Sequence, residues 1–241
     1  MANFMNVAEL AATRSPDAKL RLDIDERELC DRYARTYTGA INDVLREFRL
    51  MNQTLPITLR PLRAEMVMAG VAFTIRSARD PGMDLDGEMQ QRASLLEAIP
   101  DNAVCVWDTN HDDGAAHWGG MMTAAVKKRG VRGAIIDGGI RDTRQIAAAD
   151  FPIFYRFHSS NGMLGRSRVV AHQTAVFIGE TMVFPGDIIV ADVDGALVVP
   201  RRIACDVLRR TEQVISFEDN IKVWVDAGDS PSEIVGKGGY F

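Results

Sequence analysis

The sequence predicts an α/β fold of layered sheets and helices, with a helical segment at each end. Residues 103–149 alternate between strand-like and helix-like patterns, and this order requires a parallel crossover between strands. Residues 150–200 instead contain short apolar runs bounded by turn residues, which is typical of hairpins. Residues 203–226 place apolar side chains on one face at helical spacing, which predicts a long C-terminal helix.

The N-terminal part is expected to contain a loosely organised lead-in over residues 1–25, followed by short helices and a buried strand. Asp25 and Glu28 resemble a capping box that opens the first helix. A second helix is expected to follow Thr38, and residues 66–75 are apolar on both alternating faces, as in a strand buried between layers. A further helix is predicted at residues 87–99, with Met89, Ala93 and Leu96 on its inner side.

The middle of the chain is predicted to run strand, helix, strand, turn and helix. The strands are expected at residues 103–107 and 133–137, around a helix at 119–130 that ends at a glycine cap, Gly130. A glycine-rich turn, residues 138–142, then precedes a short helix at residues 143–149. Hairpin turns are expected at Gly179–Glu180 and at Asp194–Gly195.

Composition limits the class of protein. The chain of 241 residues is predicted to be a single domain, and its net charge of −5 argues against nucleic acid as a partner. Its three cysteines are far apart and match no disulfide set or metal spacing, so a reduced, cytoplasmic setting is expected. No apolar run reaches the ~18 residues that a membrane span needs.

The segment Ile136–Thr143 is the most informative candidate site. A predicted strand ends, two glycines follow, and Arg141 and Asp142 come directly before a helix. A guanidinium matches a carboxylate bidentately, and a single carboxylate in a cleft can hold Mg²⁺ or Mn²⁺. The alternative, which spacing alone leaves equally open, is that Asp142 caps the helix and Arg141 lies on the surface.

Two further segments invite a functional interpretation. Gly119 and Gly120 open a helix whose first N–H groups could bind a substrate carboxylate, but taken alone this segment favours a simple turn. Residues 110–117 hold two histidines and two aspartates, but their spacing fits no zinc signature, so a solvated polar loop is favoured there. His117 is the better functional candidate of its two histidines because it adjoins Gly119.

Four stretches of the chain resemble the RraA-like family, which includes 4-hydroxy-4-methyl-2-oxoglutarate/4-carboxy-4-hydroxy-2-oxoadipate aldolases and the regulator of RNase E activity A. The central stretch is GGMMTAAVKKRGVRGAIIDGGIRDTRQI, and TGAINDVL, AGVAFTIRS and VFPGDIIVADVDGALVVP agree with it. The resemblance implies a swivelling-domain-like ββα fold that assembles as homotrimers or homohexamers, with sites at subunit interfaces.

In the aldolases that this chain resembles, the arginine of the turn binds the pyruvyl carboxylate and the following aspartate ligates Mg²⁺ or Mn²⁺. Those roles fall on Arg141 and Asp142. The resemblance also implies that the N-terminal backbone of the glycine-opened helix binds substrate, namely at Gly119, Gly120, Met121 and Met122.

The chain departs from many aldolases at Gly120, where they carry an acidic residue that organises metal-bound water. His117, or an acid of residues 111–113, could replace that group. An acid from a neighbouring subunit's C-terminal helix is also implied, and Glu212, Glu218 and Asp219 are available for that role.

The sequence therefore predicts a metal-dependent carbon–carbon lyase that acts on small 2-oxo acids. Retro-aldol cleavage of 4-hydroxy-2-oxo acids and decarboxylation of oxaloacetate are both expected, because the two reactions share an enolate of pyruvate. The alternative is a non-catalytic regulator that binds an RNA-processing ribonuclease.

Overall fold

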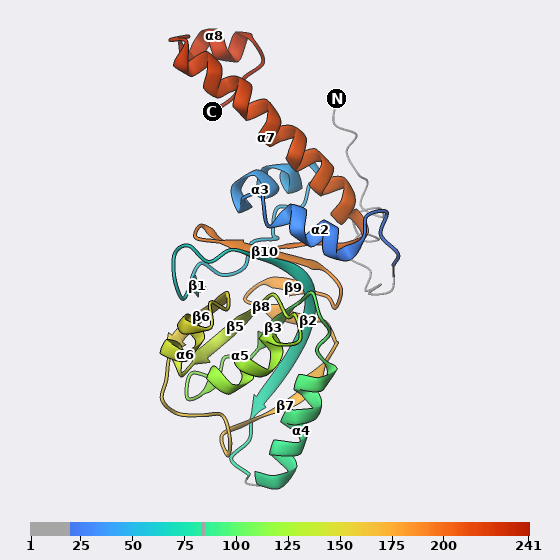
Figure 1. Ribbon diagram of the computed structural model, residues 1–241, viewed down its shortest axis with the longest axis vertical. Coiled ribbons are helices and arrows are strands. Elements are labelled where there is room, and N and C mark those ends of the chain that lie inside the picture. Colours follow the sequence, from blue (N-terminus) through green and yellow to red (C-terminus); the bar gives the residue numbers. More distant parts are fainter. Residues whose placement is uncertain (1–19, 83–84) are drawn as a thin grey trace.

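The computed structural model describes residues 20–82 and 85–241, and a nine-stranded sheet organises them (Figure 1). Its strands lie in the order β1-β6-β5-β3-β2-β10-β11, with β4 paired to β5 and β7 to β2. The strands are β1 Arg60–Pro61, β2 Met68–Arg79, β3 Ala103–Asp108, β4 Ala116–Trp118, β5 Gly133–Ile140, β6 Ile153–His158, β7 Ser167–His172, β10 Ile188–Asp192 and β11 Gly195–Val199.

Strand β2 joins two parts of this sheet. Its first half pairs antiparallel with β10, its second half pairs antiparallel with β7, and β3 runs parallel to it on the other edge. Strands β3, β5 and β6 continue the parallel part, which confirms the predicted crossovers. The antiparallel hairpin β8 (Val176–Ile178) to β9 (Thr181–Val183) forms a separate two-stranded sheet that turns at Gly179 and Glu180, as predicted.

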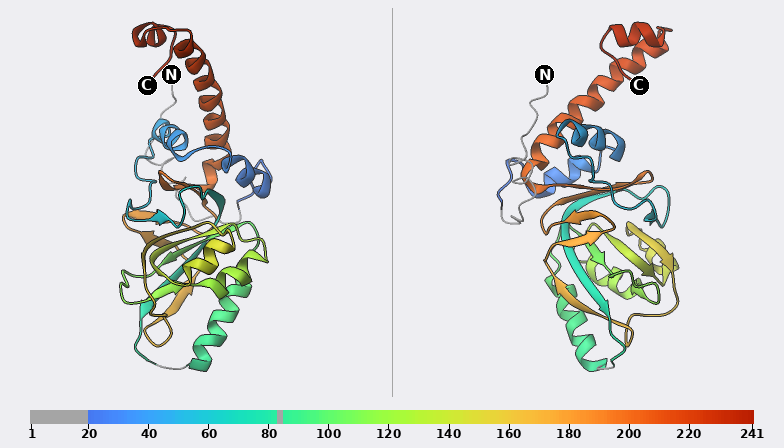
Figure 2. Two further views of the ribbon diagram at one scale, coloured as in Figure 1. Left: turned by 60° about the vertical axis from the view of Figure 1, so that its left-hand side comes forward. Right: turned by 180° about the vertical axis from the view of Figure 1, so that it is seen from behind.

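Helices cover the sheet at two places, seen from three directions in Figures 1 and 2. Helices α2 (Glu26–Tyr33), α3 (Thr38–Glu47) and the start of α7 (Ala204–Asp226) pack on β10, β11 and the first part of β2. Helices α4 (Leu85–Ala98), α5 (Gly120–Lys127) and α6 (Thr143–Ala148) flank the parallel strands. A third cluster of buried side chains joins the sheet to the β8–β9 hairpin. This layered α/β arrangement is the fold class that the sequence predicts.

Asp192, at the end of β10, fixes the start of α3. Its carboxylate accepts hydrogen bonds from the backbone N–H of Thr38 at 2.8 Å and from the Thr38 hydroxyl at 2.7 Å. The residue before α3, Tyr37, provides no side-chain cap, so the cap comes from 154 residues further along the chain. The Asp192 carboxylate therefore ties the end of β10 to the start of α3.

We expect Asp192→Ala to lower the free energy of unfolding by about 2 kcal/mol, because it leaves the buried N–H and hydroxyl of Thr38 without their acceptor. Asp194→Ala is the matched control, since Asp194 lies exposed in the same turn. Chemical denaturation of both variants measures the difference. Equal loss in the two variants would show that the turn, and not the cap, is responsible.

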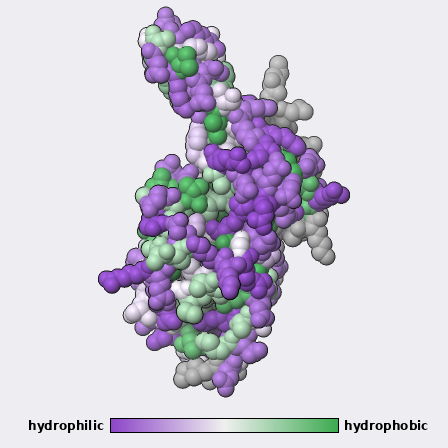
Figure 3. Space-filling view, viewed as in Figure 1, coloured by the Kyte–Doolittle hydropathy of each residue, from purple (hydrophilic) through white to green (hydrophobic). Residues whose placement is uncertain are grey.

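The C-terminal part of α7 extends away from the sheet and packs against α8 (Pro231–Gly236) (Figure 2). Ring contacts of Phe217 with Trp224 and Tyr240 hold this arm together. Hydrophobic side chains lie among the polar ones on its surface (Figure 3), and Val223 and Val225 are both at least half exposed. The predicted long helix is confirmed, whereas α8 is not anticipated by the sequence patterns.

Two sequence-based expectations are wrong in detail. The strand predicted at residues 133–137 continues to Ile140, so Gly138 and Gly139 lie within β5 and not in a turn. They are glycines because of space: a Cβ on Gly138 would lie 2.7 Å from Thr109 Cγ2, and one on Gly139 would lie 2.6 Å from Phe157 Cε2. The inner side of α4 is only partly as expected: Leu96 packs against the core, but Met89 and Ala93 are exposed and the fully buried residue of the helix is Leu95.

Most of the lead-in expected at residues 1–25 lies outside the described residues. The segment 168–178, which has the pattern of one strand, is divided into β7 and β8. A 3-10 turn, Arg201–Ile203, precedes α7. Over the described parts of the chain, no helix is both long enough and apolar enough to cross a membrane.

Candidate active site

A pocket of about 510 Å³ opens where β5 ends. Its walls come from α4, from the start of α5, from Arg141 and Asp142, and from residues 162–166. The carboxyl ends of parallel strands are where α/β proteins usually bind ligands. Of the residues that the sequence predicts as a site, His117, Gly119, Met121, Met122, Arg141 and Asp142 all line this pocket.

Asp142 does not act as the cap of α6. It has a left-handed backbone, φ 56° and ψ 35°, and its side chain makes no capping hydrogen bond to the helix that follows. Instead its Oδ2 accepts a hydrogen bond from the backbone N–H of Gly120 at 3.1 Å. The Nε of Arg141 lies 3.7 Å from the same oxygen, and the two side chains remain 47% and 35% exposed. A left-handed aspartate therefore directs its carboxylate to the start of α5 and into the pocket.

Two glycines leave room for this pair. A Cβ on Gly119 would lie 2.7 Å from Asp142 Oδ2, and a Cβ on Gly162 would lie 2.7 Å from Arg141 Nη1. Gly119 has an extended backbone, φ −160°, which any residue can adopt. Space for the aspartate, and not a turn conformation, is therefore the reason for glycine at position 119.

The first turn of α5 offers donors beside this carboxylate. The N–H of Gly120 is used by Asp142, and the helical hydrogen bonds resume at Thr123, which donates to Gly119. Between them, the N–H groups of Met121 and Met122 have no acceptor within the described chain. Unpaired N–H groups at a helix N-terminus favour an anionic ligand.

Gln145, which sequence reasoning missed, fills the space above Gly120. A Cβ on Gly120 would lie 2.1 Å from Gln145 Oε1 and 2.9 Å from its Cδ. The side chain of an acid at position 120 would have to enter the volume that this amide occupies. The only hint in the sequence is that Gln145 follows Asp142 by three residues and so lies in the same helical turn.

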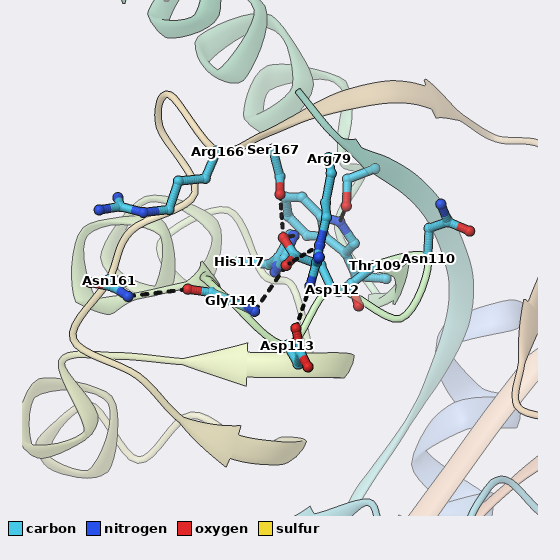
Figure 4. Close-up of polar contacts among 12 residues, drawn as sticks. Arg79, Thr109, Asn110, Asp112, Asp113, Gly114, His117, Asn161, Arg166 and Ser167 are labelled. Carbon is cyan, nitrogen blue, oxygen red and sulfur yellow. Dashed lines mark hydrogen bonds and ion pairs between the residues drawn. The ribbon is translucent and has the colours of Figure 1, made fainter. Parts of the chain in front are cut away.

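His117 belongs to a buried polar cluster centred on Asp112 (Figure 4). Asp112 accepts hydrogen bonds from the Ser167 hydroxyl, from Gly114 N–H at 2.9 Å and from Arg79 Nε at 3.1 Å. Although burial opposes its ionisation, these donors hold the pKa of Asp112 below its usual value. His117 Nε2 lies 3.5 Å from this carboxylate. The loop predicted to be solvated is therefore buried at Asp112 and at His117 and exposed at His111 and Asp113.

Burial lowers the pKa of His117 to about 4, against the smaller opposing effect of Asp112. The imidazole is therefore neutral at pH 7, and Arg92 lies close enough to contribute to the same lowering. A neutral ring in the pocket wall can accept a proton but carries no charge for binding an anion. His117 therefore does lie beside Gly119 in the pocket wall, as the sequence suggested, but its side chain is buried like that of a core residue.

We expect His117 to make the protein less stable in acid. Because the folded-state pKa lies below the unfolded value of 6.5, the unfolded chain binds the proton first as the pH falls. Neutral His117 therefore lowers the free energy of unfolding at acidic pH only. The free energy of unfolding is unaffected above about pH 6.5 and falls by roughly 3 kcal/mol between pH 6.5 and 4. Denaturation between pH 7 and 4.5 is expected to show that the free energy of unfolding of His117→Gln falls less steeply with pH than that of wild type.

His172→Gln, which changes an exposed histidine, is the control and should show the wild-type dependence on pH. The same dependence in His117→Gln would mean that His117 does not cause the loss of stability in acid.

Three arginines surround the pocket, and two of them were not found from the sequence. Arg92 comes from α4, where Met89 and Leu96 at helical spacing line the same wall. Arg166 follows the loop that contains Gly162 and donates to the Gly162 carbonyl at 3.0 Å. With Arg141 they provide three positive charges against the single carboxylate of Asp142. The spacing of residues 89, 92 and 96 is the signal that could have identified Arg92.

A divalent cation fits Asp142 only with help from other ligands. Within the described residues no group of three or more histidine, cysteine, aspartate or glutamate side chains could hold a metal ion. Asp142 is the carboxylate that lines the described pocket wall; its side chain is 35% exposed and accepts from Gly120 N–H. Mg²⁺ is commonly bound in this way, through one or two carboxylates with water and substrate oxygens. The residues present are compatible with such an ion.

The fold and this pocket define a protein of the mixed α/β class with an arginine–aspartate site beside a helix N-terminus. The family described as RraA-like, Aldolase/RraA, matches residues 28–198. The chain therefore belongs to the Aldolase/RraA family, as its sequence motifs indicate.

Individual relatives carry different descriptions. A putative 4-hydroxy-4-methyl-2-oxoglutarate aldolase of Halalkalibacterium halodurans is 27% identical over 159 residues, which is 66% of this chain and 72% of that protein. The crystal structure of RraAS2 of Streptomyces coelicolor, described as an unusual member of the RNase ES inhibitor RraA protein family, has a TM-score of 0.72 at 21% identity, covering 84% of this chain and 99% of that one. That likeness shows the fold.

A third structure is more similar. It is described as one of novel cellulases from microbes associated with the gut ecosystem, and it has a TM-score of 0.82 at 45% identity, covering 90% of this chain and 96% of that one. The chain spans 28% and 57% of the length of two further curated relatives.

Proposed function

We propose that this protein is a divalent-metal-dependent lyase that releases pyruvate from small 2-oxo acids. The observation that carries the proposal is the meeting of Arg141 and Asp142 at the N-terminus of α5, inside a pocket of about 510 Å³. The description of a relative as a putative 4-hydroxy-4-methyl-2-oxoglutarate aldolase supports the same class of reaction.

Arg141 and the start of α5 would hold the 2-oxo acid. The guanidinium of Arg141 can donate two parallel hydrogen bonds to the substrate carboxylate. Met121 and Met122 line the same pocket, and their N–H groups can donate to further substrate oxygens. The two N–H groups are fixed by the backbone of α5, so they need little rearrangement as negative charge develops on the substrate.

Asp142 would hold Mg²⁺ or Mn²⁺, which when bound supplies a Lewis acid that stabilises negative charge on the oxygen of the 2-oxo group. The methionine and leucine side chains in the pocket lining would place an apolar surface beside the reacting carbon atoms. His117, which is neutral in the pocket wall, is the side chain that we propose to accept a proton during the reaction. The homotrimer or homohexamer implied by the resemblance, with sites at subunit interfaces, stays a prediction.

The acids proposed for a neighbouring subunit's site have partners within this chain. Glu212 pairs with Arg32 at 2.6 Å, Glu218 accepts from Tyr37, and Asp219 pairs with Lys222 at 2.9 Å. The hydrogen bond from Arg32 lowers the pKa of Glu212. An acid that donates a proton at neutral pH needs a raised pKa, so Glu212 is poorly suited to that role.

The test is a lactate-dehydrogenase-coupled assay of pyruvate release, run with oxaloacetate and with 4-hydroxy-2-oxo acids. Turnover is expected with Mg²⁺ or Mn²⁺ and is expected to disappear with a chelator. The uncatalysed decay of oxaloacetate in the presence of the metal alone is the control. Absence of metal-dependent release from every substrate would falsify the proposal.

The alternative function is a regulator that binds a ribonuclease, and the description of RraAS2 as belonging to a ribonuclease inhibitor family favours it. A pull-down with the ribonuclease beside the pyruvate assay discriminates the two. Cellulose hydrolysis, which the description of another relative suggests, needs a pair of carboxyl groups across a cleft. Among the residues that the structure describes, Asp142 is the single carboxylate in the pocket wall, so the described site does not support that reaction.

A further inference from the structure

The side-chain amide of Gln145 lies against Gly120, where it finds no polar partner. Its Oε1 is only 2.1 Å from the place that a Cβ of Gly120 would occupy, so the atom it faces is a carbon. Within the described part of the chain, no hydrogen bond to this amide is found. An amide has two donors and an acceptor oxygen with two lone pairs, and Gln145 is exposed, so water reaches them.

The same glycine also holds the carboxylate of Asp142. The N–H of Gly120 donates to Asp142 Oδ2 at 3.1 Å, while the Cβ position of Gly120 faces Gln145 Oε1. The N and Cβ atoms of one residue are bonded to the same Cα and lie only about 2.5 Å apart. The carboxylate of Asp142 and the amide of Gln145 therefore flank a single residue at the start of α5.

Backbone contacts keep these two side chains together. The N–H of Gln145 donates to the Asp142 carbonyl at 2.9 Å in the first turn of α6, and residues three apart in a helical turn are neighbours on its surface. Helices α5 and α6 pack against each other (Figure 1). The first turn of α6 therefore brings the carboxylate and the amide to the start of α5 as one unit.

A cation bound to Asp142 needs further oxygen atoms. The Nε of Arg141 lies 3.7 Å from Asp142 Oδ2, and its positive charge opposes a cation at the same carboxylate. Mg²⁺ and Mn²⁺ prefer oxygen ligands, and Mg²⁺ usually keeps several of its water molecules. An amide oxygen close to the carboxylate can accept a hydrogen bond from such a water molecule, and outer groups of this kind strengthen metal binding.

We propose that Gln145 is the second protein group of the cation site at Asp142, with its Oε1 accepting a hydrogen bond from a water molecule of the bound Mg²⁺ or Mn²⁺. This inference rests on the proposed function, in which Asp142 holds the ion. In this arrangement Gln145 is a positioning residue, because it acts on the metal ion and touches no substrate. Its loss therefore weakens metal binding even when no 2-oxo acid is present.

The test measures Mn²⁺ binding to the substrate-free protein by electron paramagnetic resonance, after a chelator has removed other metal ions. Gln145→Ala is expected to raise the dissociation constant for Mn²⁺ roughly tenfold, which is the lower end of the effect of such outer groups. Gln145→Glu is expected to lower the dissociation constant below that of wild type, because it places a second carboxylate beside Asp142. Thermal melting of the metal-free variants should match wild type, since Gln145 is exposed.

Ala148→Glu is the matched control, because it adds the same negative charge at an exposed position of α6, one helical turn further from Asp142. Its affinity for Mn²⁺ is expected to stay close to that of wild type. An equal gain in Ala148→Glu and Gln145→Glu overturns the proposal, and so does an unchanged affinity in Gln145→Ala or a wild-type protein that binds no Mn²⁺. Mn²⁺ binding that depends on Gln145, without pyruvate release in the coupled assay, contradicts the proposed reaction alone.

Discussion

Asp142→Asn is expected to lower metal-dependent pyruvate release by at least roughly a hundredfold, since a Lewis-acid metal contributes several kcal/mol of transition-state stabilisation. Asparagine preserves the left-handed backbone of this position, φ 56°, which alanine would strain. It also keeps an oxygen that can accept from Gly120 N–H. The variant therefore removes the negative charge while it leaves the fold of the turn in place. Rates measured over a range of Mg²⁺ and Mn²⁺ concentrations give the effect.

Asp150→Asn is the matched control, because Asp150 follows α6 with a similar left-handed backbone, φ 48°, but pairs with Arg63 outside the pocket. It is expected to retain wild-type activity and metal response. Full activity of Asp142→Asn at the metal concentrations that saturate the wild-type protein would show that Asp142 is not a metal ligand.

Arg141→Gln is expected to reduce kcat/KM on the order of a hundredfold, mainly through a higher KM, because the substrate carboxylate loses a charged bidentate donor. Arg141→Lys should recover only part of this loss, since an ammonium keeps the charge but not the planar fork. The coupled assay with oxaloacetate measures both variants.

Arg144→Gln provides the comparison for Arg141. Arg144 lies exposed on α6, outside the pocket wall, so its loss changes the local charge without removing a pocket donor. An equal decrease in the two variants would mean that long-range attraction of the anionic substrate, and not direct binding by Arg141, accounts for the effect.

The fold was largely predictable because its elements depend on local patterns. Short continuous runs of apolar residues identify β2, β3 and β10, and helical spacing of apolar residues identifies α3 and α7. Both signals can be read without knowing how the rest of the chain folds. The extent of β5 was not predictable in this way. Gly138 and Gly139 are typical turn residues, and only their neighbours Thr109 and Phe157 show that they lie in a strand with no room for a side chain.

The candidate site was predictable where its residues are adjacent in sequence. Arg141 and Asp142 lie side by side, and the crossover brings Gly119 and Gly120 to them. Arg92 and Gln145 were missed for a different reason. Their contribution depends on how α4 and α6 pack against the start of α5. Helical spacing shows which residues share a face of a helix, but it does not show which other helix that face will meet.

The position of Gln145 over Gly120 limits which side chains can replace glycine at position 120. Because the Gln145 amide occupies the space that a side chain at position 120 would need, the two positions are not independent. Gln145 is exposed and its amide is the end of a flexible side chain, so a glutamate could enter at position 120 once that amide had turned away towards solvent. Residue 145 therefore influences which side chains position 120 accepts.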